Sequence, residues 1–255
     1  MLSKIKSIAL KGLEGFLVEI QTNISNGVPE FEIVGLPDAT VKEAKKRIET
    51  AIKNSGIEFP NKKILINLAP ADIRKGGSCF DLAMAIGILI ALNATLKIDI
   101  NKLVNTIFIG ELSLDGKVNR VNGILPMCIE AKNLGIKRII LPKANANEAS
   151  IVEDVDIIAI SNIEELIKYL NNEIYLEKIK NSIQNNIILE KYDIDFSDVK
   201  GQENVKRALE ISAAGGHNCL LIGSPGSRKN NVSKKIANYF TRIKYRRSYG
   251  NYKNI

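Results

Sequence analysis

The sequence predicts a mixed α/β (α+β) fold, and three observations support this class. Short apolar segments with strand character alternate with segments of helical periodicity along most of the chain. Glycines and an Asp-Gly pair separate these segments at turn positions. The 255 residues are 45% hydrophobic and 25% charged, which is ordinary for globular proteins and excludes general disorder.

The first elements expected are strands followed by one amphipathic helix. Residues 5–36 alternate partly between apolar and polar, with glycine breaks, as short strands do. Asp38 is a suitable N-cap for the next helix, and Gly56 supplies its stop. One face of this helix is predicted to be buried: Val41, Ala44, Ile48, Ala51 and Ile52.

A buried strand, a central helix and a hairpin are expected next. Residues 63–68 (KILINL) have the composition of a buried strand. Residues 80–92 are almost wholly apolar, which predicts a helix buried on all sides. Asp115-Gly116 indicates a hairpin turn because both positions tolerate positive φ, and it joins predicted strands over 106–114 and 117–124.

Three regions are predicted along the chain. A first domain covers residues 1–170, a polar and Asn-rich linker covers 171–195, and a second unit covers 196–255. We expect the remaining elements to be helices over 126–134, 163–170 and 202–214 and strands over 138–142, 156–160 and 218–222, the last leading into a glycine turn.

Several classes of site and location are excluded or disfavoured by residue counts. Cys79, Cys128 and Cys219 lie far apart, and His217 is the single histidine. This pattern argues against a Cys/His zinc site or a disulfide framework, and His217 is expected to be a structural turn residue. The longest apolar run, 82–92, is too short to cross a bilayer, and the N-terminus lacks a signal-peptide core. We expect a cytoplasmic protein with reduced thiols and no membrane partner.

The net charge of +8 is concentrated at one end. Residues 228–255 hold nine basic residues, no acid and four of the seven tyrosines, which leaves 27 basic and 28 acidic residues in 1–227. Cations interleaved with aromatic rings are typical of single-strand-binding segments. Two other basic groups are candidates either for a nucleic-acid face or for solvated surface: Arg74, Lys75, Lys62 and Lys63, and on one helix Lys42, Lys45, Lys46 and Arg47.

The segment CLLIGSPGSRKN over 219–230 approximates a phosphate-binding loop, G-x-x-x-x-G-K-[ST]. Such a loop needs glycines for close approach to phosphate, a lysine for the β/γ-phosphates and a hydroxyl for Mg²⁺. Here Arg228 stands at the second glycine and Asn230 at the hydroxyl position, so a simple surface turn is an alternative. The candidate nucleotide-binding residues are Gly223, Ser224, Pro225, Gly226, Ser227 and Lys229.

Four longer segments resemble the ComM/YifB family of magnesium-chelatase-like AAA+ ATPases. They are VGLPDATVKEAKKRIETAIKNSG (34–56), NLAPADIRKGGSCFDLAMAIGIL (67–89), GELSLDGKVNRVNGILP (110–126) and VKGQENVKRALEISAAGGHN (199–218). The resemblance implies a Lon-protease-like domain of the ribosomal S5 domain 2 type, followed by the start of a P-loop AAA+ module. For the intact family it implies ATP, Mg²⁺, self-association into a ring, and nucleotide-dependent processing of DNA.

The resemblance is expected to end at Ser227. Back-translated with suitable synonymous codons and read one base later, residues 228 onward begin GKTMLAKRL, which restores the glycine, the lysine and a threonine. We therefore favour one extra nucleotide after the Ser227 codon, which places residues 228–255 out of frame. As written, the chain lacks the Walker-B acid, sensor and arginine finger of such modules, so we expect an incomplete module that does not hydrolyse ATP.

A serine protease is the rival reading of the first domain. Ser78 in GGSCF matches the segment that carries the nucleophile of Lon-type peptidases, which use a Ser–Lys dyad. The position matching the lysine is Leu125, which cannot accept a proton. We therefore favour Ser78 as a helix N-cap, in a capping-box variant with Asp81, and expect a non-proteolytic domain. The other rival is a nucleic-acid-binding module that uses the basic tail.

Overall fold

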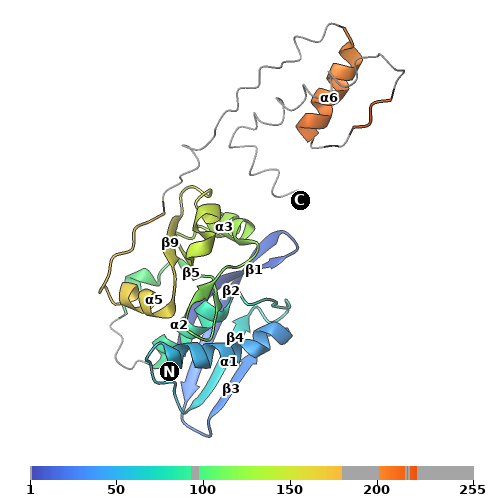
Figure 1. Cartoon of the computed structure of the whole chain (residues 1–255). Coiled ribbons are helices and arrows are strands. Elements are labelled where there is room, and N and C mark those ends of the chain that lie inside the picture. The colour runs from blue at the N-terminus through green and yellow to red at the C-terminus, as the bar shows by residue number, and fades with distance from the viewer. Residues whose placement is uncertain (1, 93–97, 180–200, 216, 218, 223–255) are drawn as a thin grey trace. The chain divides into compact units, whose positions relative to one another are not determined.

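The computed structural model describes residues 2–92, 98–179, 201–215, 217 and 219–222 (Figure 1). Contacts between Cα atoms divide the chain into two units, residues 1–185 and 186–255. The predicted nucleotide-loop residues 223–229 and the tail 228–255 lie outside the described residues. No described helix is both long enough and apolar enough to span a bilayer.

The first unit is built on a seven-stranded sheet in which only β2 runs against its neighbours. The strand order is β3-β4-β2-β1-β5-β8-β9. All other neighbouring pairs are parallel, so the sheet is mixed and mostly parallel. This confirms the predicted mixed α/β class. The strands are β1 Leu2–Lys11, β2 Glu14–Ser25, β3 Glu30–Val34, β4 Lys63–Ala69, β5 Thr106–Phe108, β8 Arg138–Pro142 and β9 Asp156–Ile160.

The register of β2 against β4 follows from the alternation of apolar residues. Ile20 pairs with Leu68, and all the even-numbered residues of β4 are buried. A shift by one residue would place these side chains in water, so burial of one face fixes the pairing.

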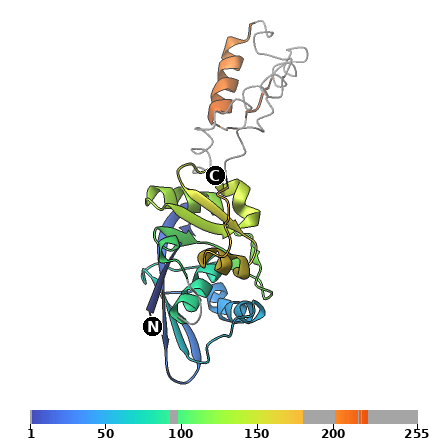
Figure 2. The same cartoon turned by 90° about the vertical axis from the view of Figure 1, so that its left-hand side faces the viewer.

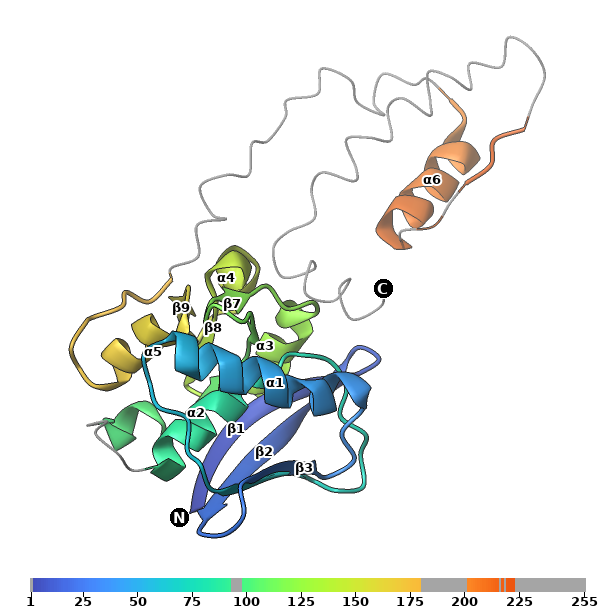
Figure 3. The same ribbon diagram turned by 60° about the horizontal axis from the view of Figure 1, so that its bottom comes forward.

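The two longest helices of the first unit, α1 and α2, lie on the same side of the sheet (Figures 2 and 3). Helix α1 (Ala39–Asn54) buries the five residues predicted from its periodicity, and Asp38 caps it by accepting the Val41 N–H at 2.8 Å. Helix α2 (Asp81–Leu92) is buried along nearly its whole length, packs on β1 and β2, and is covered by α1. The central helix and the capped helix are therefore confirmed.

Helix α3 (Ile124–Asn133) packs on the opposite side of the same strands. A Cβ atom at Gly87 of α2 would meet Ser3 of β1, whereas one at Gly123, which precedes α3, would meet Leu10. Residues of odd and even number in β1 point to opposite faces. The sheet is thus enclosed between α1 and α2 on one face and α3 on the other. Two further helices, α4 (Ala146–Ala149) and α5 (Ile163–Leu170), follow β8 and β9.

The hairpin at Asp115-Gly116 is shorter than expected. Only β6 (Glu111–Leu112) and β7 (Val118–Asn119) pair there, because β5 joins the main sheet instead. Gly116 takes a φ of 82°, and Asp115 does not adopt positive φ. Instead, the Asp115 side chain accepts the Lys117 N–H at 3.2 Å, so the carboxylate stabilises the turn.

Residues at the end of the first unit run along β9. Lys178 forms an antiparallel bridge with Ile158, and the Ile179 N–H donates to the Ile157 carbonyl at 2.9 Å. Residues 178 and 179 of the predicted linker therefore lie against the edge strand β9. Short structures η1 (Ile100–Lys102) and η2 (Lys143–Asn145) complete this unit.

The described part of the second unit is one helix and a short segment. Helix α6 spans Glu203–Gly215, close to the predicted 202–214. The predicted strand at 218–222 is wrong for the described residues 219–222, which form no strand. Leu220 and Ile222 are 83% and 88% exposed, and an apolar strand forms only where a neighbour pairs with it.

Candidate functional site

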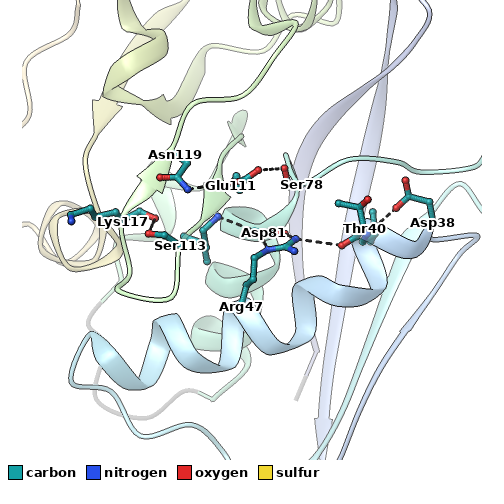
Figure 4. Close-up of polar contacts among 11 residues, drawn as sticks. Asp38, Thr40, Arg47, Ser78, Asp81, Glu111, Ser113, Lys117 and Asn119 are labelled. Carbon is teal, nitrogen blue, oxygen red and sulfur yellow. Dashed lines mark hydrogen bonds and ion pairs between the residues drawn. The ribbon is translucent and has the colours of Figure 1, made fainter.

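Polar side chains gather where three parallel strands end. Asp38 follows β3, the loop containing Lys75 and Ser78 follows β4, and Glu111 follows β5. Carboxyl ends of parallel strands are the usual place for ligands in α/β sheets. We call this group the carboxyl-edge cluster; it consists of Asp38, Arg47, Lys75, Ser78, Asp81 and Glu111. Figure 4 shows all of these except Lys75 as labelled side chains.

Ser78 does not cap α2, contrary to the expectation from its sequence. Its hydroxyl donates to the Glu111 carboxylate, and Asn119 donates to the other carboxylate oxygen at 3.3 Å (Figure 4). The helix begins at Asp81, three residues later. The Ser78 hydroxyl therefore ties the loop after β4 to the β6–β7 hairpin.

Asp81 is also not the partner of Ser78 in a capping box. Its carboxylate accepts from Arg47 Nε at 2.8 Å and Nη2 at 3.1 Å, and from the Leu112 N–H at 3.2 Å. The Asp81 side chain is 1% exposed and that of Arg47 is 22% exposed. The expectation that Arg47 belongs to a solvated helix face is therefore wrong. This clamp joins α1, α2 and β6.

The electrostatics of the clamp follow from its burial. Burial raises the pKa of Asp81, and the hydrogen bond and charge of Arg47 oppose this rise. The same hydrogen bond raises the pKa of Arg47. A buried charge is stable only when it is paired, so Asp81 depends on Arg47.

Lys75 is fully buried and its amine has no hydrogen-bond partner within the described part of the chain. Burial lowers the pKa of its ammonium group. Backbone bonds hold the loop in place, since the Asp38 N–H donates to the Lys75 carbonyl at 2.9 Å and the Lys75 N–H to the Leu36 carbonyl at 3.1 Å. Leu36 itself has a φ of 58°, a left-handed conformation that is strained for leucine.

The first basic group, a candidate for a nucleic-acid face or for solvated surface, does not form one face. Lys62 and Lys63 lie at the beginning of β4, whereas Arg74 and Lys75 follow its end. Lys63 pairs with Glu30 at 2.9 Å, and Lys75 is buried. The four residues therefore share no surface.

No Ser–Lys hydrogen bond forms among the described residues of the cluster, because the Lys75 amine has no hydrogen-bond partner there. Leu125, at the position that matches the Lon lysine, is 3% exposed on α3. The only hydrogen bond that the structure records for the Ser78 hydroxyl within the described residues is to Glu111. A carboxylate can accept the serine proton, but its ordinary pKa makes it a weaker base than a neutral lysine amine. The arrangement therefore supports positioning of the loop better than nucleophilic catalysis.

The remaining predicted residues have structural contacts or lie outside the described part. The His217 N–H donates to the Ser212 carbonyl at 2.9 Å, which closes the C-terminal end of α6. The thiols of Cys79 and Cys128 are buried, and burial raises the pKa of Cys79 to about 12. No cluster of three or more potential metal-ligating His, Cys, Asp or Glu residues occurs where the structure is described. Nothing is shown for Gly223, Ser224, Pro225, Gly226, Ser227 and Lys229.

Comparison with protein families gives two matches in order along the chain. Residues 20–145 match subunit ChlI of magnesium chelatase, and residues 195–252 match a second description of that subunit. The second match extends to residue 252, which corrects the expectation that the resemblance ends at Ser227.

Individual relatives cover nearly the whole chain. The competence protein ComM of Haemophilus influenzae is 38% identical over 239 residues, which is 92% of this chain and 46% of ComM. The uncharacterized protein YifB of Escherichia coli is 39% identical over 235 residues, 92% of this chain and 45% of YifB. Lon protease 2 of Bacillus subtilis is 29% identical over 171 residues, 60% of this chain and 30% of that protease. The chain thus spans about half the length of ComM and YifB.

Proposed function

The chain belongs to the ComM/YifB family of magnesium-chelatase-like proteins, and we propose that it supplies the amino-terminal part of a ring-forming motor that processes DNA. The observation that carries the proposal is the order of the two ChlI matches along a chain similar to ComM throughout. In this proposal the second unit is the start of an AAA+ module that uses ATP and Mg²⁺ in the intact family. The first unit is a Lon-like platform on which the ring is built.

The platform is proposed to be non-proteolytic. The Ser78 hydroxyl donates a hydrogen bond to Glu111, and Leu125 occupies the place of the dyad lysine. A serine-reactive fluorophosphonate probe tests this. We expect the full chain and its Ser78→Ala variant to be labelled to the same extent. Stoichiometric labelling that disappears in Ser78→Ala would instead support the Lon-like protease.

The nucleotide loop of this chain is proposed to be inactive as written. Arg228 brings a side chain where a glycine must approach phosphate, and Asn230 lacks the hydroxyl that holds Mg²⁺. No catalytic step is derived through this loop. We propose that one extra nucleotide after the Ser227 codon put residues 228–255 out of frame, although a family match that continues to residue 252 is what an intact frame would give. Sequencing the gene through this region is the test, and an intact frame with no shifted Gly-Lys-Thr reading refutes it.

The rival of a nucleic-acid-binding module depends on the tail. Residues 228–255 carry nine basic residues and no acid. Deleting them abolishes binding of single-stranded DNA if the tail is the binding element. If binding of single-stranded DNA survives the deletion, we assign it to the first unit. Fluorescence anisotropy at fixed salt compares the DNA affinity of the full chain with that of the deletion variant.

A further inference from the structure

A recess lies at the amino ends of β5 and β8, at the opposite edge of the sheet from the carboxyl-edge cluster. Its volume is about 440 Å³, and it sits beside Arg138, the first residue of β8, and Lys102, which precedes β5. The segment that runs along β9 closes one side. We call it the amino-edge pocket, and its lining includes Lys102, Arg138, Tyr169, Tyr175 and Lys178. The acidic Glu173 also lines it and accepts a hydrogen bond from Asn171 Nδ2 at 2.9 Å.

Two of the three cations in the amino-edge pocket have no carboxylate partner within the described residues. Lys178 pairs with Asp156 at 2.8 Å. Lys102 instead donates to the Tyr169 carbonyl, and Arg138 Nη1 donates to the Lys102 carbonyl at 3.2 Å. Among the described residues, the Nε and Nη2 groups of Arg138 form no hydrogen bond, so they are available to a ligand.

These two charges also disfavour each other. Burial lowers the pKa of the Lys102 ammonium, and the nearby charge of Arg138 lowers it further, while Asp99 opposes both. Two unpaired cations in a half-buried recess are stabilised by an anion that contacts both. A planar guanidinium with free N–H groups fits the oxygens of a phosphate.

Aromatic rings lie beside the cations. Tyr169 is almost buried, and the Lys102 amine stands 4.0 Å from the centroid of its ring. Tyr175 is 81% exposed, although it lines the pocket. An exposed ring next to cations is the combination that stacks a nucleobase while its phosphate is neutralised. An acidic peptide would use the cations but not the open ring.

We propose that the amino-edge pocket binds a nucleoside phosphate, with the phosphate on Arg138 and Lys102 and the base on the ring of Tyr175. The volume suits one nucleotide, because small-molecule sites begin at about 300 Å³. The nucleotide is either free or one unit of a single strand, since both present the same groups. The proposal is independent of the motor function, because the predicted nucleotide loop is in the other unit.

The chain contains no tryptophan, so Tyr175→Trp provides a single reporter at the pocket. The full chain with this change is titrated with adenosine 5′-monophosphate, a short oligothymidylate, inorganic phosphate and a polyglutamate peptide. We expect the nucleotide and the oligonucleotide to quench the tryptophan fluorescence. The ligand that binds more tightly shows whether the pocket takes a free nucleotide or one unit of a single strand. Absence of quenching by both up to millimolar concentration, or tighter binding of polyglutamate than of either, overturns the proposal.

Arg138→Gln in the reporter background is expected to weaken nucleotide binding at least tenfold. Arg120→Gln is the matched control, because Arg120 is exposed and its partner Glu148 lies outside the pocket; it should change affinity less than twofold. If Arg138→Gln fails to fold by circular dichroism, Tyr175→Ala in the otherwise unchanged chain replaces it. Calorimetry should then show weaker binding of the nucleotide and unchanged binding of inorganic phosphate. Equal nucleotide affinity in the substituted and unsubstituted chains contradicts the assignment.

Discussion

Replacing Arg47 by methionine should destabilise the first unit strongly, because Asp81 would keep its charge without its partner. The Asp81 side chain is 1% exposed, and removing one member of a buried pair typically costs 3–5 kcal/mol. Arg47 is 22% exposed and the Leu112 N–H still contacts Asp81, so the lower end applies. We expect a loss of about 3 kcal/mol at about pH 8, or roughly 150-fold in the folding equilibrium.

The pH dependence distinguishes this cause from lost packing. Burial already raises the pKa of Asp81, and without Arg47 it rises further. An acid whose pKa is raised in the folded state destabilises that state as the pH rises from the ordinary pKa, about 3.9, through the raised pKa. The deficit of Arg47→Met should therefore shrink as pH falls from about 8 towards 5, because Asp81 becomes neutral.

Urea unfolding followed by far-ultraviolet circular dichroism measures these differences. The double variant Arg47→Met/Asp81→Asn removes the orphaned charge, keeps an acceptor for Leu112, and should recover about 2 kcal/mol. Arg120→Met is the control, since its ion pair with Glu148 is 65% and 35% exposed and should contribute under about 0.5 kcal/mol. A deficit below about 1 kcal/mol, or a double variant no more stable than the single one, refutes the reasoning.

Three other predictions concern single side chains. Lys75→Met should raise stability at neutral pH and make stability depend less on pH. A lysine whose pKa is lowered on folding makes stability rise with pH up to the ordinary lysine pKa of about 10.4. Lower stability of the variant in the same urea assay contradicts this. Asp38→Ala removes the acceptor of the Val41 and Gly77 N–H groups and should lower stability by about 1–2 kcal/mol, and a change below about 0.3 kcal/mol speaks against the cap. Of the three thiols, Cys219 alone should react with a maleimide in the folded chain, and rapid labelling of either buried thiol by mass spectrometry counts against the described burial.

Local patterns predicted the elements that depend on local physics. The buried face of α1 and its cap at Asp38 follow from helical spacing and from the preference of short acidic residues for N-caps. The burial of α2 follows from its nearly unbroken apolar run. These features need no knowledge of what the segment packs against.

Features that depend on distant partners were not predicted. Arg47 and Asp81 are 34 residues apart, and Ser78 and Glu111 are 33 apart, so no local spacing joins them. One signal was present: an aspartate at the start of a wholly apolar helix needs a buried cation, because isolated buried charges are too costly. The strand expected at 218–222 is absent from the described residues 219–222 for the same reason, since apolar composition does not supply a pairing neighbour.

The amino-edge pocket likewise arises only from the fold. Lys102, Arg138 and Tyr175 come from three separate segments that meet at the start of the parallel strands. Each residue alone is an ordinary surface residue in the sequence. Only the folded chain brings the exposed ring of Tyr175 into one pocket with Lys102 and Arg138.

The most direct test of the motor proposal is ATP turnover with and without DNA. It compares this chain with protein made from the same gene after removal of the proposed extra nucleotide. We predict that the corrected protein hydrolyses ATP and is stimulated by single-stranded or branched DNA, whereas this chain shows no turnover. Turnover by the unmodified chain, or no turnover by the corrected protein, would contradict the account.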